Sequence, residues 1–74
     1  MAGKAQHVVP NGGKWSVRKA GSERASGTFD TQNEAINAAT RIAKNQRTEL
    51  YVHGQDGRIR DRRSYGNDPY PPKG

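Results

Sequence analysis

Alternating polar and apolar positions predict two strands near the start of the chain. Residues 7–10 form a short run rich in β-branched side chains, and residues 14–19 alternate with a period of two. Between them Asn11-Gly12 carries the Asn-Gly signal of a tight hairpin turn, and we expect Pro10 to end the first strand. In the second run Trp15 and Val17 point to one face of the sheet, and polar side chains point to the other.

The apolar pattern then changes to a helical period. Residues 24–29 form a weaker strand, which a meander of three strands requires. Thr31 and Glu34 have the spacing of a capping box, in which a hydroxyl accepts from the N–H three residues later and the glutamate reaches back. A narrow, alanine-rich apolar stripe follows, so the sequence predicts a helix over about 31–46 that lies close against a sheet.

A second hairpin follows the helix. Residues 49–53 read as a strong strand, residues 54–57 contain the turn signal Asp-Gly, and residues 58–63 read as the returning strand. The predicted order is β-β-(β)-α-β-β. This order is typical of an α+β fold, in which a mostly antiparallel sheet of four to five strands packs on one helix.

The domain boundaries follow from the same pattern. We expect a flexible start over 1–6, a single α+β domain over 7–63 and a proline-rich tail over 64–74. The tail either packs back on Trp15 and enlarges the core, or forms a polyproline II ligand for another protein.

The composition argues against an enzyme. The chain has 74 residues, of which only 30% are apolar, so the core is thin and a catalytic cavity would remove contacts from it. The large apolar side chains are Val8, Val9, Trp15, Val17, Phe29, Ile36, Ile42, Leu50, Tyr51, Val52 and Ile59. No motif supplies a nucleophile with an oriented base, and we expect no small-molecule substrate and no cofactor.

Two histidines and no cysteine leave little chemistry for a metal. His7 and His53 have no partners at metal-ligand spacing, so we expect ordinary hydrogen bonds for both and no metal site. The absence of cysteine fits a reducing cytoplasm, which is the expected location. The sequence contains neither a signal peptide nor an apolar run long enough to cross a membrane, and we expect no membrane partner.

Four separated segments resemble a known family. They are residues 7–15, 29–32, 53–59 and 65–74, and they are similar to the small prokaryotic domain-of-unknown-function family 2188, found in bacteria or phage. The resemblance implies a complete single-domain protein whose tail belongs to the domain. It implies no activity, because the label of the family states that its function is unknown.

A weaker similarity covers residues 13–43. A lysine–tryptophan strand, a basic strand and an alanine-rich helix are similar to the AP2-like and integrase-arm DNA-binding domains. Those domains lay a three-stranded sheet in the major groove of DNA. The similarity would make Lys14, Trp15, Arg18 and Arg24 contacts to DNA, and it rests on the fold alone.

The positive charge is concentrated late in the chain. The net charge is +6, and residues 58–63 contain four arginines. If Ile59 faces the helix, alternation directs Arg58, Arg60 and Arg62 to the face of the sheet turned away from the helix, which we call the open face. Guanidinium groups there suit phosphate oxygens. Because Tyr51 alternates with Leu50 and Val52, we expect its ring on the open face as well. The candidate nucleic-acid-binding residues are Lys14, Arg18, Arg24, Tyr51, Arg58, Arg60 and Arg62.

The sequence therefore favours a basic, non-enzymatic module that binds DNA or RNA mainly through phosphates. The alternative is a protein-interaction or structural module, in which a protein partner or a second copy pairs with an edge strand or the tail. In that case the charge serves solubility and protects the edge of the sheet.

Overall fold

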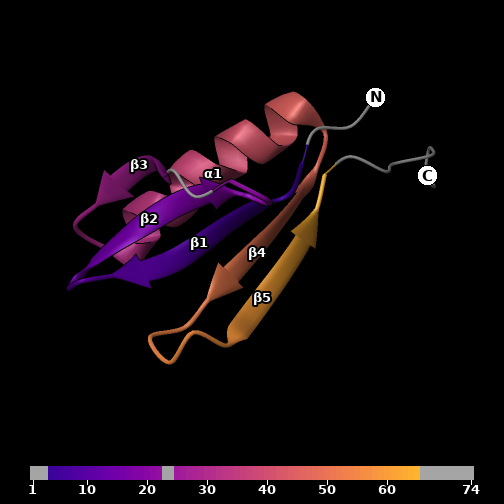
Figure 1. The fold of residues 1–74 in the computed structure, drawn as a ribbon. Helices are drawn as coiled ribbons and strands as arrows, with labels where there is room; N and C mark the ends of the chain where they lie inside the picture. Colours follow the sequence, from indigo (N-terminus) through magenta and orange to yellow (C-terminus); the bar gives the residue numbers. More distant parts are fainter. Residues whose placement is uncertain (1–3, 23–24, 66–74) are drawn as a thin grey trace.

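The computed structural model describes residues 4–22 and 25–65. It consists of one sheet with a single helix against one face (Figure 1). In chain order the elements are β1 (Gln6–Asn11), β2 (Lys14–Lys19), β3 (Ala25–Phe29), α1 (Gln32–Gln46), β4 (Glu49–His53) and β5 (Ile59–Ser64). This confirms the α+β class and the order β-β-β-α-β-β, with the weak third strand included.

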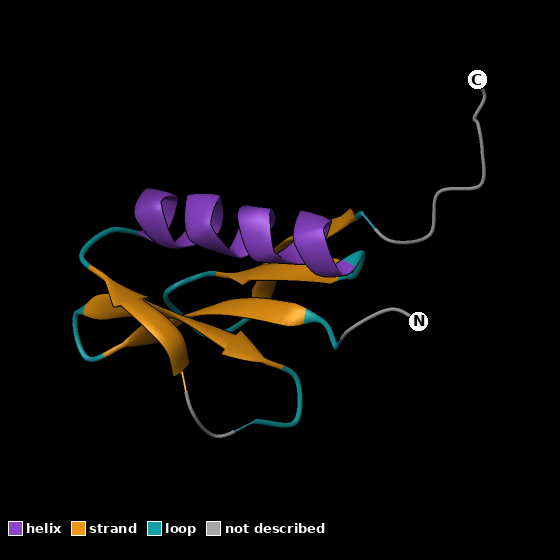
Figure 2. Cartoon of the chain, turned by 90° about the horizontal axis from the view of Figure 1, so that it is seen from above, coloured by secondary structure: helices purple, strands orange, loops and turns teal. Residues whose placement is uncertain are grey.

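The five strands lie in the order β3-β2-β1-β4-β5. The chain pairs antiparallel everywhere except between β1 and β4, which run parallel. The reason is that α1 carries the chain from β3, at one edge, back across the sheet to the free side of β1. Seen from above, the helix covers one side of the twisted sheet only (Figure 2).

The first hairpin turns at Gly12 and Gly13, with φ angles of 58° and 85°, and Asn11 pairs with Lys14. Positive φ at both central positions matches the twist of the flanking strands. The expectation that Pro10 ends the first strand is wrong, because β1 continues to Asn11. Beyond Val8 the pairing with β4 stops, so Pro10 lies at a local edge of the sheet, where a missing N–H is tolerated.

The helix begins as the capping signal predicts. The Thr31 hydroxyl accepts a hydrogen bond from the Glu34 backbone N–H at 3.2 Å. The helix ends at Arg47, which has a left-handed φ of 55° and whose N–H reaches the carbonyls of Ala43 and Lys44. These local signals account for both ends of α1.

The core lies between α1 and the sheet. Trp15 is buried there, on the helix side of the sheet, so it does not lie on the open face as the DNA contact that the similarity to AP2-like domains would make it. The apolar core residues are Val8, Trp15, Val17, Ala35, Ala39, Ala43, Leu50 and Val52, with Phe29, Ile36, Ile42 and Tyr65 packed around them. The three helix alanines are fully buried, so the helix backbone approaches the strands closely.

Ile59 corrects the expected core. Its side chain is 55% exposed, because α1 contacts β1 to β4 but, among the described residues, makes no contact with β5. Every residue of β5 is exposed. The last strand therefore extends the sheet beyond the cover of the helix.

The start of the expected tail contacts the domain at Tyr65. Its N–H donates to the Thr48 carbonyl at 3.2 Å, and the Lys44 ammonium lies 5.6 Å from the centre of its ring. The rest of the tail, residues 66–74, and residues 1–3 of the expected flexible start lie outside the described residues. Gln6, also assigned to that start, is buried in β1. Within 4–22 and 25–65 no helix has the length and apolarity needed to span a membrane.

Candidate functional site

Four side chains form a row across the open face, one from each of four neighbouring strands. Arg18 on β2 is the Cα partner of His7 on β1, and His7 is in turn the partner of Tyr51 on β4. Tyr51 is the partner of Arg62 on β5. Paired residues in a sheet place their side chains on the same face. We call Arg18, His7, Tyr51 and Arg62 the cross-strand row.

Two rings occupy the middle of the row. The His7 and Tyr51 rings are stacked, with centroids 5.0 Å apart and planes inclined at 22°. Both residues are half-buried, and the flanking Arg62 is exposed. The expectation that Tyr51 lies on the open face is confirmed, but one side of its ring is already occupied by His7.

Glu49 holds the hydroxyl group of Tyr51. The hydroxyl donates to the Glu49 carboxylate two residues earlier on β4. That hydrogen bond is the main reason why the pKa of Tyr51 is raised above its usual value of 10.0, with smaller contributions from burial and from the charge of Glu49. The positive charge of Arg62 acts in the opposite direction and lowers this pKa. Tyr51 is therefore neutral at physiological pH and oriented by a partner.

His7 also contacts a second imidazole. His7 Nδ1 lies 3.0 Å from His53 Nε2, and His53 Nδ1 lies 2.9 Å from the carbonyl oxygen of Gly57. Burial lowers the pKa of His7 below 6.5, and the nearby charge of His53 lowers it further. The expectation of ordinary hydrogen bonding for both histidines is confirmed. We call His7 and His53 the imidazole pair.

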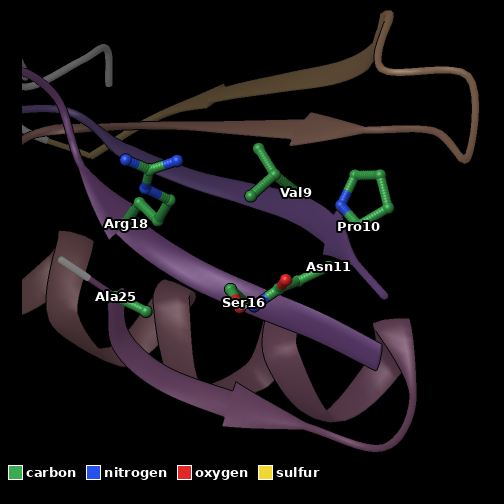
Figure 3. A pocket seen from close by; sticks show the side chains of 6 residues that line it. All are labelled: Val9, Pro10, Asn11, Ser16, Arg18 and Ala25. Atoms are coloured by element: carbon green, nitrogen blue, oxygen red, sulfur yellow. Dashed lines mark hydrogen bonds between the residues drawn. The ribbon is translucent and has the colours of Figure 1, made fainter. Parts of the chain in front are cut away.

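Arg18 lies between two shallow depressions of the open face. One, of about 310 Å³, is lined by Val9, Pro10, Asn11, Ser16, Arg18 and Ala25, and Figure 3 shows Arg18 and Val9 projecting beside it from neighbouring strands. The other, of about 260 Å³, brings Arg18 next to His7 and the 20–22 turn. The guanidinium of Arg18 donates to the Ser22 carbonyl at 3.1 Å, which leaves other donors of its five for a ligand.

The other predicted basic residues are more dispersed. Lys14 lies on the open face, where its ammonium pairs with Asp30 at 3.1 Å. Arg58 lies in the turn before β5, with its side chain 87% exposed and 3.9 Å from Asp56. Arg24 lies outside the described residues.

The expected alternation along residues 58–63 is broken by a β-bulge. Asp61 pairs with Val52, but the next pair along is Ile59 with His53, so Arg60 is left without a Cα partner on β4. The side chain of Arg60 lies over Gly54, where a Cβ would come within 2.4 Å of its Cδ. The assumption that Ile59 faces the helix is therefore wrong. Of Arg58, Arg60 and Arg62, only Arg62 belongs to the cross-strand row.

The sequence interpretation did not include His7 and His53 in the site. Alternation directs His7 to the face opposite to that of its neighbour Val8, and His53 to the face opposite to that of Val52. Both imidazoles could therefore have been assigned to the open face. Their contact depends on the parallel pairing of β1 with β4, which no local pattern reveals. Within 4–22 and 25–65 no three metal-ligating side chains converge, so the imidazole pair has no third ligand.

Comparison with known proteins identifies one family. The model of DUF2188, described as an uncharacterized protein conserved in bacteria, matches residues 6–65. No curated protein and no solved structure matches the chain. The weaker similarity to AP2-like and integrase-arm domains is therefore not confirmed.

Proposed function

The chain belongs to DUF2188, a family of uncharacterized bacterial proteins, and we propose that this member binds nucleic acid through the open face of its sheet. The proposed contacts are mainly to phosphates. They involve the cross-strand row rather than the whole arginine-rich segment.

The observation that carries the proposal is the position of Arg18 and Arg62 at opposite ends of the row. Three strand spacings separate them, a span of about 14 Å between backbones. Two guanidinium groups at this separation reach different phosphates of one strand, and each offers bidentate hydrogen bonds. The rings between them offer edges and partly covered faces for contacts to bases or sugars.

The local charge supports an anionic ligand. Among the described residues no carboxylate forms an ion pair with Arg18 or Arg62. The acidic groups on this face are already engaged, since Asp30 pairs with Lys14 and Glu49 accepts from Tyr51. The two arginines at the ends of the row thus keep their charge available for phosphate.

Salt titration tests the proposal directly. We expect binding of a fluorescent oligothymidylate, a single-stranded RNA or a DNA duplex at low salt, with affinity that falls linearly on a log–log plot. The expected slope is about −0.7 per phosphate contact for single strands and about −0.9 for a duplex. Arg18→Gln and Arg62→Gln should each weaken binding and make the slope shallower by about one contact.

The control variant is Arg41→Gln, on the exposed side of α1, which removes the same charge from the opposite side of the domain. It should leave the affinity close to that of the wild type. No binding to any of the three probes at low salt would overturn the proposal, and an equal loss in all three variants would show that only net charge matters.

The edge of β5 is the feature that favours the alternative, a protein-interaction module. Ile59 is exposed there and the strand has one paired side among the described residues. However, the Asp61 carboxylate already accepts from the Arg62 N–H at 2.9 Å, and antiparallel pairing of two copies would bring arginines together. We therefore propose a partner other than a second copy for this edge. Sedimentation at micromolar concentration should show a monomer, and a dimer would contradict this choice.

A further inference from the structure

We infer that the imidazole pair links nucleic-acid binding at the cross-strand row to the uptake of one proton. The inference rests on the proposed function and assigns a regulation to the same site. Its basis is the hydrogen-bond chain from Gly57 through His53 to His7, which ends next to Arg18.

This hydrogen-bond chain determines which ring nitrogens carry a proton when both histidines are neutral. The Gly57 carbonyl can only accept, so His53 Nδ1 carries a hydrogen and His53 Nε2 presents a lone pair. His7 Nδ1 must then donate to His53 Nε2. As a result His7 Nε2 is left as a hydrogen-bond acceptor, which offers nothing to a phosphate oxygen.

One added proton reverses this property. When the pair takes up a proton, His7 Nε2–H and His53 Nδ1–H are both donors, while the third proton is shared between the two rings. His7 lines the depression of about 260 Å³ together with Arg18, so the new positive charge lies beside one of the two guanidinium groups proposed to bind phosphate. The protonated pair therefore completes an anion site that the neutral pair leaves incomplete.

Burial and the charge of His53 disfavour the protonated form of His7 in the free protein. Arg18 faces His7 from β2, and Arg62 lies beyond Tyr51 on β5. The titratable and charged groups around the pair are Arg18 and Lys19 on β2, Glu49 and Tyr51 on β4, Asp56 and Arg58 in the turn, and Arg62 on β5. Of the two carboxylates in this set, Glu49 accepts a hydrogen bond from the Tyr51 hydroxyl and Asp56 lies beside Arg58, so neither is paired with His7.

A bound phosphate acts in the opposite direction. Its negative charge favours the imidazolium, so the pKa of the pair is higher in the complex than in the free protein. By linkage, affinity rises as the pH falls between these two values, by at most tenfold per pH unit for one proton. Because burial and His53 lower the pKa of free His7, the rise extends below pH 6.5.

The test measures affinity for oligothymidylate, whose bases do not titrate near neutral pH, from about pH 5.5 to about pH 8 at constant ionic strength. Calorimetry in two buffers with different ionisation enthalpies gives the number of protons taken up. We expect tighter binding at the acidic end and an uptake approaching one proton. His7→Asn should bind with nearly constant affinity over this range, whereas Arg41→Gln should keep the full pH dependence.

The outcomes separate the two proposals. Binding that is independent of pH, without proton uptake, would overturn the inference and leave the proposed function standing. Unchanged pH dependence in His7→Asn would overturn the assignment to the imidazole pair. Absence of binding at every pH would overturn the proposed function, and the inference with it. The imidazole proton resonances of His7 in the free protein should titrate below pH 6.5, and a pKa at or above that value would contradict the neutral state assigned to free His7.

Discussion

Ile59 on β5 lies across from His53 on β4, although Asp61 is already the partner of Val52. Two pairs that are adjacent on β4 are therefore two residues apart on β5, and Arg60 is the extra residue. The bulge places Ile59 on the same face of the sheet as its partner His53. It also interrupts the alternation that would have put Arg60 and Arg62 on one face. The irregularity leaves Arg62 as the partner of Tyr51 and leaves Arg60 without a partner on β4.

The first prediction concerns these two arginines. Arg62→Gln should weaken oligonucleotide binding by several-fold at low salt, because it removes one end of the cross-strand row. Arg60→Gln removes the same charge from a side chain that lies over Gly54, and it should have a clearly smaller effect. Fluorescence anisotropy at two salt concentrations measures both variants. Equal losses would show that the bulge has no bearing on binding.

The second prediction concerns stability on the two sides of the β4–β5 pair. Leu50→Ala should lower the free energy of unfolding by about 2–5 kcal/mol, because Leu50 is fully buried beneath α1 and its truncation leaves a cavity. Ile59→Thr should change it by about 0.5 kcal/mol or less, since Ile59 is mostly exposed. Urea unfolding followed by Trp15 fluorescence compares the two. A large loss in Ile59→Thr would place this side chain in the core after all.

The third prediction is a pH dependence of stability in the absence of ligand. The pKa of His7 is lower in the folded protein than its usual 6.5, so the folded state disfavours the imidazolium. Stability is then full above pH 6.5 and decreases as the pH falls from there through the folded-state pKa. Thermal unfolding between about pH 5 and about pH 8 should show this decrease in the wild type. His7→Asn should flatten that part of the curve, and a curve of unchanged slope would exclude His7 as its source.

The fourth prediction concerns Tyr51 and Glu49. The Tyr51 hydroxyl donates to the Glu49 carboxylate, and this bond raises the pKa of Tyr51. Glu49→Gln should bring that pKa back toward 10.0, because the carboxylate that opposes the tyrosinate is gone. The absorbance difference between each protein and its Tyr51→Phe derivative isolates the titration of this residue. An identical pKa with and without Glu49 would mean that the hydrogen bond does not form in solution.

Much of the fold was predictable because its signals are local. The capping spacing of Thr31 and Glu34 predicted the start of α1, and alternation around Trp15 predicted which face of β2 is buried. The same alternation placed Arg18 and Tyr51 on the open face. These properties depend on the geometry of a few consecutive residues, which tertiary contacts leave unchanged.

The site was predictable only in part because its contacts are distant in the sequence. His7 and His53 are separated by 46 positions and meet only because β1 pairs in parallel with β4. The alternation assumed for residues 58–63 failed because a bulge shifts the register without a signal such as glycine at the bulged position. Pro10, taken as the end of a strand, is accommodated because its neighbour strand has already ended.

The sequence by itself determined the elements, their order, the apolar face of the first hairpin and the excess of positive charge. The tertiary structure alone decided that Arg18, His7, Tyr51 and Arg62 form one row and that Arg58 and Arg60 lie outside it. The physical reason is that periodicity specifies the face on which a side chain lies within its own strand. Strand order and register specify which side chains from other strands lie next to it, and these are properties of the assembled sheet.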